Sequence, residues 1–498
     1  MTVAPPSQAD LAAYREEADR FEAELLEEHY LHYAGHKPQL ELEPIYERHA
    51  GLTERERVRA VGAAVRGDEA TRWLWRFAVE GYLGNLTKEH TERVARLEAE
   101  LEATVDGESI RFRMLQPVMA NEPDRERRRR LRDVAAALRD EHMNPVMLEA
   151  ARLHRGAVPT LEAGDYVEVY ERIGFDLEGL ADQCRSLLDS TERLWEEHAD
   201  RLFRARVGVG LDEAAQWDVP RLFRAAEWDA DFPADRMLPA LDGTLADLGV
   251  DLRSQENVHL DLEQRPGKDP RAFCAPIEVP QRVMLVIQPI GGLDDWRALF
   301  HEAGHTEHYA HVDSTRSIEA KRFGDAAVTE GWATLMENLV REPAWLDRRL
   351  DVSRPRQLAS EGAVIDLYFT RRYAAKLLYE LEFYRAPDIE AMRGRYVELL
   401  GEALKIEPTP ANYLFDIDAG FYVTEYLRSW AFEAQLRDFL RTEFGNTWFT
   451  RRDAGELLRE LWSEGQERRA DDMLAELTGS GIEMAAIEDR IREGLALA

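Results

Sequence analysis

The sequence has little of what would mark it as secreted or membrane-bound. Its two cysteines, Cys184 and Cys274, are too few and too far apart for a disulfide framework or a cysteine-based zinc site. No uninterrupted apolar run approaches the length of a membrane span. The start of the chain has neither a basic segment nor an apolar core, so we expect no signal peptide and, by default, a cytoplasmic protein.

Positive charge is also scarce. The 498 residues include 64 Lys and Arg against 96 Asp and Glu, which gives a formal net charge of −32. This surplus of negative charge disfavours nucleic acid and anionic membranes as partners. One basic cluster, Arg125–Arg130, begins a charged helix, and we expect its side chains to be solvated.

The most informative feature is a pair of histidines four residues apart, His301 and His305. On an α-helix, positions i and i+4 lie on the same face, so both imidazoles can reach one metal ion. Glu302 is rotated by about 100° from His301. It can therefore lie beside the metal as a base rather than as a ligand. Two histidines, an open coordination position and a carboxylate are typical of zinc peptidases.

The surrounding residues place this motif inside a helix. Gly291 and Gly292 indicate a loop, and an Asp is expected to cap the helix that follows. No Pro or Gly cluster interrupts the helix before His311. The alternative is a surface helix that carries incidental histidines.

A third metal ligand is available downstream, in a second helix predicted over residues 326–339. Glu330 and Glu337 are two helical turns apart and share a face with Ala and Val side chains. Carboxylates in such apolar surroundings are costly unless they are paired or bound to metal. The alternative is a solvated stripe of charge, because most charged residues are exposed.

These residues resemble the thimet oligopeptidase and oligoendopeptidase F group of zinc peptidases. Its members typically read Leu-Phe-His-Glu-x-Gly-His-x-x-His, and Leu299–His308 matches this pattern. The family's third zinc ligand is a Glu 29 residues after the first His, followed seven residues later by a Glu-Asn pair, which here are Glu330 and Glu337-Asn338. The resemblance covers about residues 265–430. It implies that His301, His305 and Glu330 hold Zn²⁺.

The clearest β-strand prediction is Arg282–Gln288, rich in β-branched residues and closed by Pro289. In zinc peptidases of this kind, an edge strand beside the metal-binding helix pairs with the extended substrate. The alternative for this strand is a buried structural role without a ligand.

A later segment carries two tyrosines, Tyr422 and Tyr426, with the spacing of two family tyrosines that stabilise the oxyanion. The resemblance implies the same role here, since a phenol can donate to an oxyanion without carrying charge. Ile417 stands where the family has a His, Ser429 replaces a third Tyr, and the family's double glycine is reduced to Gly420. Core packing is the alternative explanation for each tyrosine.

Other histidines are weaker candidates. His308 lies one turn beyond His305 and could contact substrate or the oxyanion. A helix cannot easily bring three stacked histidines to one ion, so Glu330 is the better third ligand. A separate group with helical spacing comprises His29, His32 and His36. Because no acidic base or third-ligand motif accompanies this group, a packed or solvated face is favoured over a second metal site.

Most of the chain has the pattern of amphipathic helices, which predicts a mostly α fold with a small sheet near residues 256–288. We expect an N-terminal helical region over residues 1–205 and a catalytic region over residues 206–498. The resemblance implies two helical lobes around a deep substrate channel, with the sheet beside the zinc-binding helix. Such a channel would admit flexible oligopeptides and exclude folded proteins.

The predicted activity is metal-assisted hydrolysis of peptide bonds in short, unfolded oligopeptides. Glu302 would take a proton from water and pass it to the leaving amine, and Glu337 would orient a ligand histidine. One alternative is a carboxypeptidase on a related helical zinc scaffold, which needs a basic group for the substrate's free carboxylate. Another is a non-enzymatic, zinc-stabilised peptide-binding protein, against which the presence of Glu302 argues.

Overall fold

The computed structural model describes residues 6–65, 67–161 and 163–497. Residues 1–5, on which the signal-peptide prediction partly depends, lie outside this part of the chain. The helices of the first half are α1 (Gln8–Tyr33), α2 (Glu43–Arg48), α3 (Arg55–Ala64), α4 (Glu69–Glu100), α5 (Leu115–Asn121), α6 (Arg125–Leu138), α7 (Asn144–Ala157), α8 (Tyr166–Ile173), α9 (Leu177–Arg206), α10 (Val219–Arg224) and α11 (Ala234–Asp247). Those of the second half are α12 (Leu293–His311), α13 (Ala326–Leu339), α14 (Pro343–Arg349), α15 (Pro355–Arg385), α16 (Met392–Leu404), α17 (Tyr422–Phe444), α18 (Arg452–Ser463), α19 (Ala470–Thr478) and α20 (Ala485–Leu495). The strands are β1 (Glu102–Val105), β2 (Glu108–Arg111), β3 (Val258–Asp261), β4 (Phe273–Glu278) and β5 (Arg282–Val286).

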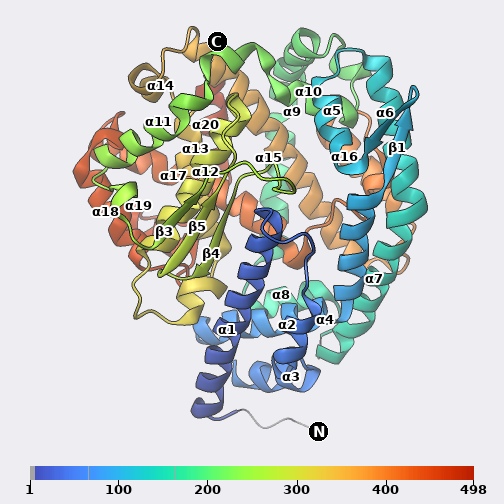
Figure 1. Ribbon diagram of the computed structural model, residues 1–498, viewed down its shortest axis with the longest axis vertical. Helices are drawn as coiled ribbons and strands as arrows, with labels where there is room; N and C mark the ends of the chain where they lie inside the picture. The colour runs from blue at the N-terminus through green and yellow to red at the C-terminus, as the bar shows by residue number, and fades with distance from the viewer. Residues whose placement is uncertain (1–5, 66, 162, 498) are drawn as a thin grey trace.

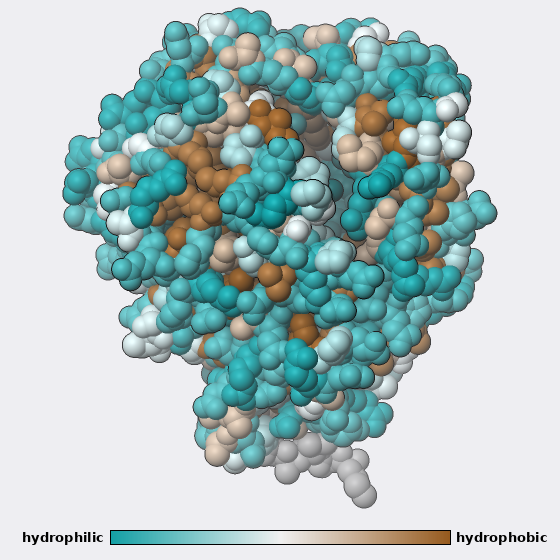
Figure 2. Space-filling model, in the orientation of Figure 1, coloured by the Kyte–Doolittle hydropathy of each residue, from teal (hydrophilic) through white to brown (hydrophobic). Residues whose placement is uncertain are grey.

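Most of the chain is α-helical, which confirms the predicted fold class. The helices are arranged in two halves (Figure 1). In this view α11 to α14 and α17 to α19 lie on the left with the sheet, and α4 to α7 lie on the right with α16. The long helix α15 runs between them. The space-filling view shows the surface hollowed between the two halves (Figure 2). Within the described ranges, no helix combines the length and apolar character needed to cross a membrane.

The sheet beside α12 has the strand order β3-β5-β4, with β5 parallel to β3 and antiparallel to β4. The predicted strand Arg282–Gln288 corresponds to β5, whose two neighbours pair with both of its edges. Its side chains Val283, Leu285 and Val286 are fully buried. The prediction that this strand pairs with substrate is therefore wrong, and its alternative, a buried structural strand, holds. The edge strand next to α12 is β4.

The helix that carries the histidine pair begins two residues earlier than an N-cap at Asp294 would place it. Gly292 occupies the N-cap position with a φ of 88°, which favours glycine. Asp295 lies in the first turn instead, and its carboxylate accepts hydrogen bonds from the backbone N–H groups of Ile290 and Gly291 at 2.6 and 2.9 Å. The prediction of an Asp N-cap is therefore wrong. The Asp295 carboxylate still bonds to loop amides, and its negative charge interacts favourably with the positive end of the helix dipole. The helix continues without interruption to His311, as expected from the absence of a Pro or Gly cluster.

The second predicted helix, α13, has the bounds expected from the sequence. It packs against α12 at Gly304, where a Cβ atom would lie 2.6 Å from both the Cα of Ala333 and the carbonyl oxygen of Trp332. Any larger residue at position 304 would push the two helices apart. The glycine between the two histidines therefore sets the distance between α12 and α13, and with it the distance between the predicted ligands.

A cluster of buried aromatic side chains holds α12 in place. Trp296 and Phe300 pack edge-to-face on Trp345, with ring centroids 6.3 and 5.1 Å apart. Trp332 of α13 belongs to the same core. Truncating one such ring typically costs about 3–5 kcal/mol, so this side of α12 is a rigid support. The predicted division at residues 205 and 206 falls at the end of α9 and stays a prediction.

Candidate metal centre

Three predicted ligands meet where α12 faces α13. His301 and His305 come from α12, and Glu330 comes from α13. One ligand atom from each of the three lies within 4.8 Å of the others. Oε2 of Glu330 is 3.7 Å from Nε2 of His301 and 3.8 Å from Nε2 of His305. Among the described residues, this is the one such group of three or more potential ligands.

The opposite ring nitrogens of the two histidines are tied to α13. His301 donates from Nδ1 to Oε2 of Glu337 at 3.0 Å. Nδ1 of His305 is hydrogen-bonded to Oγ1 of Thr329 at 2.8 Å. A ring whose Nδ1 carries the proton keeps the lone pair of Nε2 free. The Nε2 atoms of both rings face Oε2 of Glu330, where they are potential metal ligands.

The carboxylate of Glu330 is only half satisfied. Its Oε1 accepts a hydrogen bond from the hydroxyl of Tyr422 at 2.7 Å. Its Oε2 is buried and has no hydrogen-bond partner among the described residues. A buried carboxylate oxygen without a partner is costly, and a cation between it and the two imidazoles would remove that cost. The donor set of two imidazoles and one carboxylate therefore fits a metal ion.

Burial and neighbouring charges shift the pKa values of the two imidazoles in opposite directions. Burial alone would lower the pKa of His301, but the hydrogen bond and charge of Glu337, together with Glu302 and Glu330, raise it to about 9. Burial and the neighbouring His301 hold the pKa of His305 well below its ordinary value. Burial also raises the pKa of Glu330. The neighbouring carboxylates thus favour positive charge at His301.

Glu302 lies beside the ligands without joining them. The backbone N–H of Cys274, on the edge strand β4, donates to its Oε2 at 2.8 Å. Burial raises the pKa of Glu302 to about 7, against the lowering effect of His301. A carboxylate with a pKa near neutrality can both accept and release a proton, as a general base requires.

Tyr422 and Tyr426 lie in the first turns of α17, with ring centroids 5.0 Å apart. Tyr422 reaches the metal centre through its hydrogen bond to Glu330, and Tyr426 packs edge-to-face on Tyr373 at 5.4 Å. Phe421, just before the helix, has a φ of 49°, and its fully buried ring fixes that conformation. The turn therefore positions the hydroxyl of Tyr422 within hydrogen-bond distance of Glu330.

His308 is placed differently from the other candidates. Its side chain is fully buried beside Tyr309, against the backbone of Gly465. Burial lowers its pKa to about 3. Because no part of the ring is exposed, substrate does not reach it in this structure.

Two other sequence features lie away from the centre. His36 is hydrogen-bonded to Asp261 at 3.1 Å and so ties the end of α1 to the sheet. The cluster Arg125–Arg130 is not wholly solvated as expected, because Arg128 is buried and pairs with Asp218 at 3.0 Å. That arginine satisfies a buried carboxylate.

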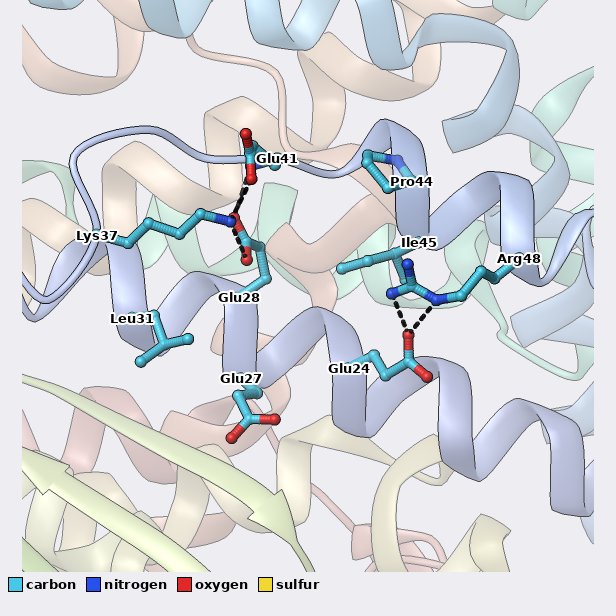
Figure 3. A pocket seen from close by; sticks show the side chains of 9 residues that line it. All are labelled: Glu24, Glu27, Glu28, Leu31, Lys37, Glu41, Pro44, Ile45 and Arg48. Atoms are coloured by element: carbon cyan, nitrogen blue, oxygen red, sulfur yellow. Dashed lines mark hydrogen bonds and ion pairs between the residues drawn. The ribbon is translucent and has the colours of Figure 1, made fainter.

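A cavity of about 470 Å³ lies between α1 and α2 (Figure 3). Most of the side chains that line it are charged, and its cations form ion pairs with its carboxylates. Lys37 pairs with Glu28 at 2.7 Å, and Arg48 pairs with Glu24. None of its lining residues belongs to the metal centre. We therefore assign the chemistry to the centre and not to this cavity.

Three contacts of the centre were not anticipated from the sequence. They are the hydroxyl of Thr329 on His305, the backbone N–H of Cys274 on Glu302, and Arg297 on Glu337. Thr329 adjoins a predicted ligand, and Arg297 lies one turn before His301. Their positions in the sequence therefore indicated only weakly that their side chains would contact the metal centre. Their partners depend on how α12, α13 and β4 pack.

Comparison with known proteins supports the fold. No protein-family model matches the chain, and no curated protein matches it. Among solved structures, the chain is similar to a crystal structure of a "putative oligoendopeptidase F from Bacillus anthracis str. Ames", with a TM-score of 0.61 and 17% sequence identity. The similarity covers 97% of this chain and 85% of that chain. The chain therefore shares the overall fold of that protein.

Proposed function

We propose that this protein is a zinc-dependent oligopeptidase that hydrolyses peptide bonds in short, unfolded peptides. The observation that carries the proposal is the buried Oε2 of Glu330, which faces Nε2 of His301 and Nε2 of His305 without a hydrogen-bond partner among the described residues. The shared fold with a protein described as an oligoendopeptidase F supports it.

His301, His305 and Glu330 would hold the ion. Bound zinc would act as a Lewis acid and lower the pKa of a coordinated water toward neutrality. Glu302 accepts a proton from the attacking water and then delivers it to the leaving amine. The phenol of Tyr426 donates to the oxyanion that develops on the scissile carbonyl, and that of Tyr422 does so when its single O–H turns from Glu330 to the oxyanion.

The free edge of the sheet supports a proposal for where the peptide backbone binds. β4 lies at the sheet edge, and its Cys274 contacts Glu302 directly. An extended peptide added along this edge would lie beside the general base. The hollow between the two halves of the molecule would admit a flexible chain more readily than a folded domain.

The test is a digest of a mixed oligopeptide library, read by mass spectrometry, with the zinc-loaded native chain and its Glu302→Gln variant. Internal cuts that disappear in the variant would support the oligopeptidase. Stepwise loss of C-terminal residues would instead indicate a carboxypeptidase. Peptide binding without any cut would indicate a zinc-stabilised binding protein.

A further inference from the structure

Arg297 lies one turn before His301 on α12 and connects to it through the neighbouring helix. Its Nε donates to Oε1 of Glu337 at 3.0 Å, and its Nη2 donates to the same oxygen. The other oxygen of Glu337 accepts from Nδ1 of His301. Each carboxylate oxygen is thus committed to one partner, and the plane of the carboxylate is fixed between the two α12 side chains.

The two histidines of the centre are therefore supported unequally. His301 donates to a carboxylate, whereas His305 is bonded to the neutral hydroxyl of Thr329. An anionic acceptor makes the opposite nitrogen a stronger ligand and fixes the ring more firmly than a hydroxyl does. The stronger support depends on a charge that is mostly buried.

Charge balance shows why Glu337 needs the arginine. Three carboxylates gather at this centre, those of Glu302, Glu330 and Glu337. Burying a carboxylate among others is costly unless a cation bonds to it directly. Arg297 supplies that cation at Oε1 of Glu337, the oxygen that is not bonded to His301, and its side chain is only 19% exposed.

We propose that Arg297 is a positioning residue for the metal centre. It holds Glu337 in place, and through Glu337 it fixes the ring orientation and the proton position of His301. The affinity of the centre for metal then depends on a side chain that touches neither the metal nor the substrate. The inference rests on the proposed function in that the ion tested is zinc.

The first test measures zinc binding alone, by competition with a chromogenic chelator on the full-length, metal-stripped chain. Arg297→Met should raise the zinc Kd by about 10-fold to 100-fold, the range for losing an outer partner of a metal ligand. Arg297→Lys keeps the charge and should recover part of that loss. The visible spectrum of the Co²⁺-loaded protein should change in Arg297→Met, since it reports ligand geometry.

Arg371→Met is the matched control. Arg371 is also buried, and it donates to the carbonyl oxygens of Ala403 and Leu188 and to Oγ1 of Thr191, none of which belongs to the metal centre. This variant should lower the melting temperature and leave the zinc Kd within about twofold. An equal loss of zinc affinity in Arg371→Met would overturn the inference, because general destabilisation would then explain both.

A double-mutant cycle with Glu337→Gln tests the route of the effect. If Arg297 acts through Glu337, adding Arg297→Met to Glu337→Gln should not weaken zinc binding further. Additive losses would contradict this route. An unchanged zinc Kd in Arg297→Met, with a raised KM for peptides bearing a free C-terminal carboxylate, would make Arg297 a substrate contact instead.

The outcomes separate this inference from the proposed function. If the native chain binds zinc and cuts peptides while Arg297→Met binds zinc equally well, this inference alone fails. If the native chain binds no zinc, both fail.

Discussion

Among the buried carboxylates of α13 and α17, two groups differ in how their charges are balanced. At the first, Asp325 caps α13 and accepts two hydrogen bonds from Arg428, at 2.7 and 2.5 Å. Glu425 lies beside it and accepts from Arg76 at 2.8 Å and from Arg428 at 3.2 Å. Every carboxylate oxygen in this cluster has a donor.

At the second place, five residues further along α13, the balance is incomplete. Glu330 has one oxygen bonded to Tyr422 and one without a partner among the described residues, opposite the Nε2 atoms of His301 and His305. The same two helices thus carry a closed ionic cluster and an open one. The closed cluster has no carboxylate oxygen left for a further cation, whereas the open one has the oxygen that we propose as a metal ligand.

The largest effect is expected at the base beside the open cluster. Glu302→Gln removes the proton acceptor and should lower kcat by about 10²-fold to 10⁴-fold. Zinc content, measured by atomic absorption, should stay at the native level, because Glu302 is not a ligand. Loss of metal equal to that in Glu330→Gln would remove the distinction between base and ligand.

The closed cluster should respond in stability and not in metal content. Arg428→Met leaves Asp325 and Glu425 buried without their shared cation, which should destabilise the fold by about 3–5 kcal/mol. Denaturant unfolding of the metal-free chain measures this. A stable variant that had lost zinc would show that the two clusters are not separate.

Glu330→Gln, in the open cluster, should lose metal binding and keep the stability of the metal-free fold. Zinc at about 1,000 times its Kd should stabilise the native chain by about 4 kcal/mol, which raises its melting temperature. In the variant this rise should disappear, while the metal-free melting temperature should not fall, because a costly buried charge is removed. A zinc-dependent rise that persists would exclude Glu330 as a ligand.

Variants of Tyr422 and Tyr426 test whether the phenols beside the open cluster take part in catalysis. If each phenol donates to the oxyanion, Tyr422→Phe and Tyr426→Phe should each lower kcat by about 10²-fold to 10³-fold, with little change in KM. Tyr422→Phe should also change zinc affinity, because its hydroxyl donates to Glu330. Full kcat in both variants, combined with lower melting temperatures, would assign both rings to packing.

The smallest effect concerns pH. Burial alone would raise the pKa of Asp325, but the guanidinium of Arg428 holds it below its ordinary value of 3.8. A carboxyl with a lowered folded pKa contributes stability above about pH 3.8 and loses it as the pH falls further. The stability gap between the native chain and Arg428→Met should therefore narrow between pH 5 and pH 3 in urea unfolding. A gap that widened on acidification would contradict the pairing.

Local periodicity determined much of the candidate site. The spacing of His301 and His305 requires only a helix, and the spacing of Glu330 and Glu337 requires only a second one with the predicted bounds. The mostly α fold and the small sheet follow from the same kind of pattern. These features depend on neighbours along the chain, so one sequence is enough to predict them.

Packing between elements decided the rest. Whether β5 or β4 lies at the sheet edge depends on strand order, which the apolar pattern of one strand does not encode. The partners of His301 and His305 on α13, and the link from Arg297 through Glu337, depend on the rotation of one helix against another. Helical spacing gives the face on which a side chain lies, but tertiary structure determines what that face meets.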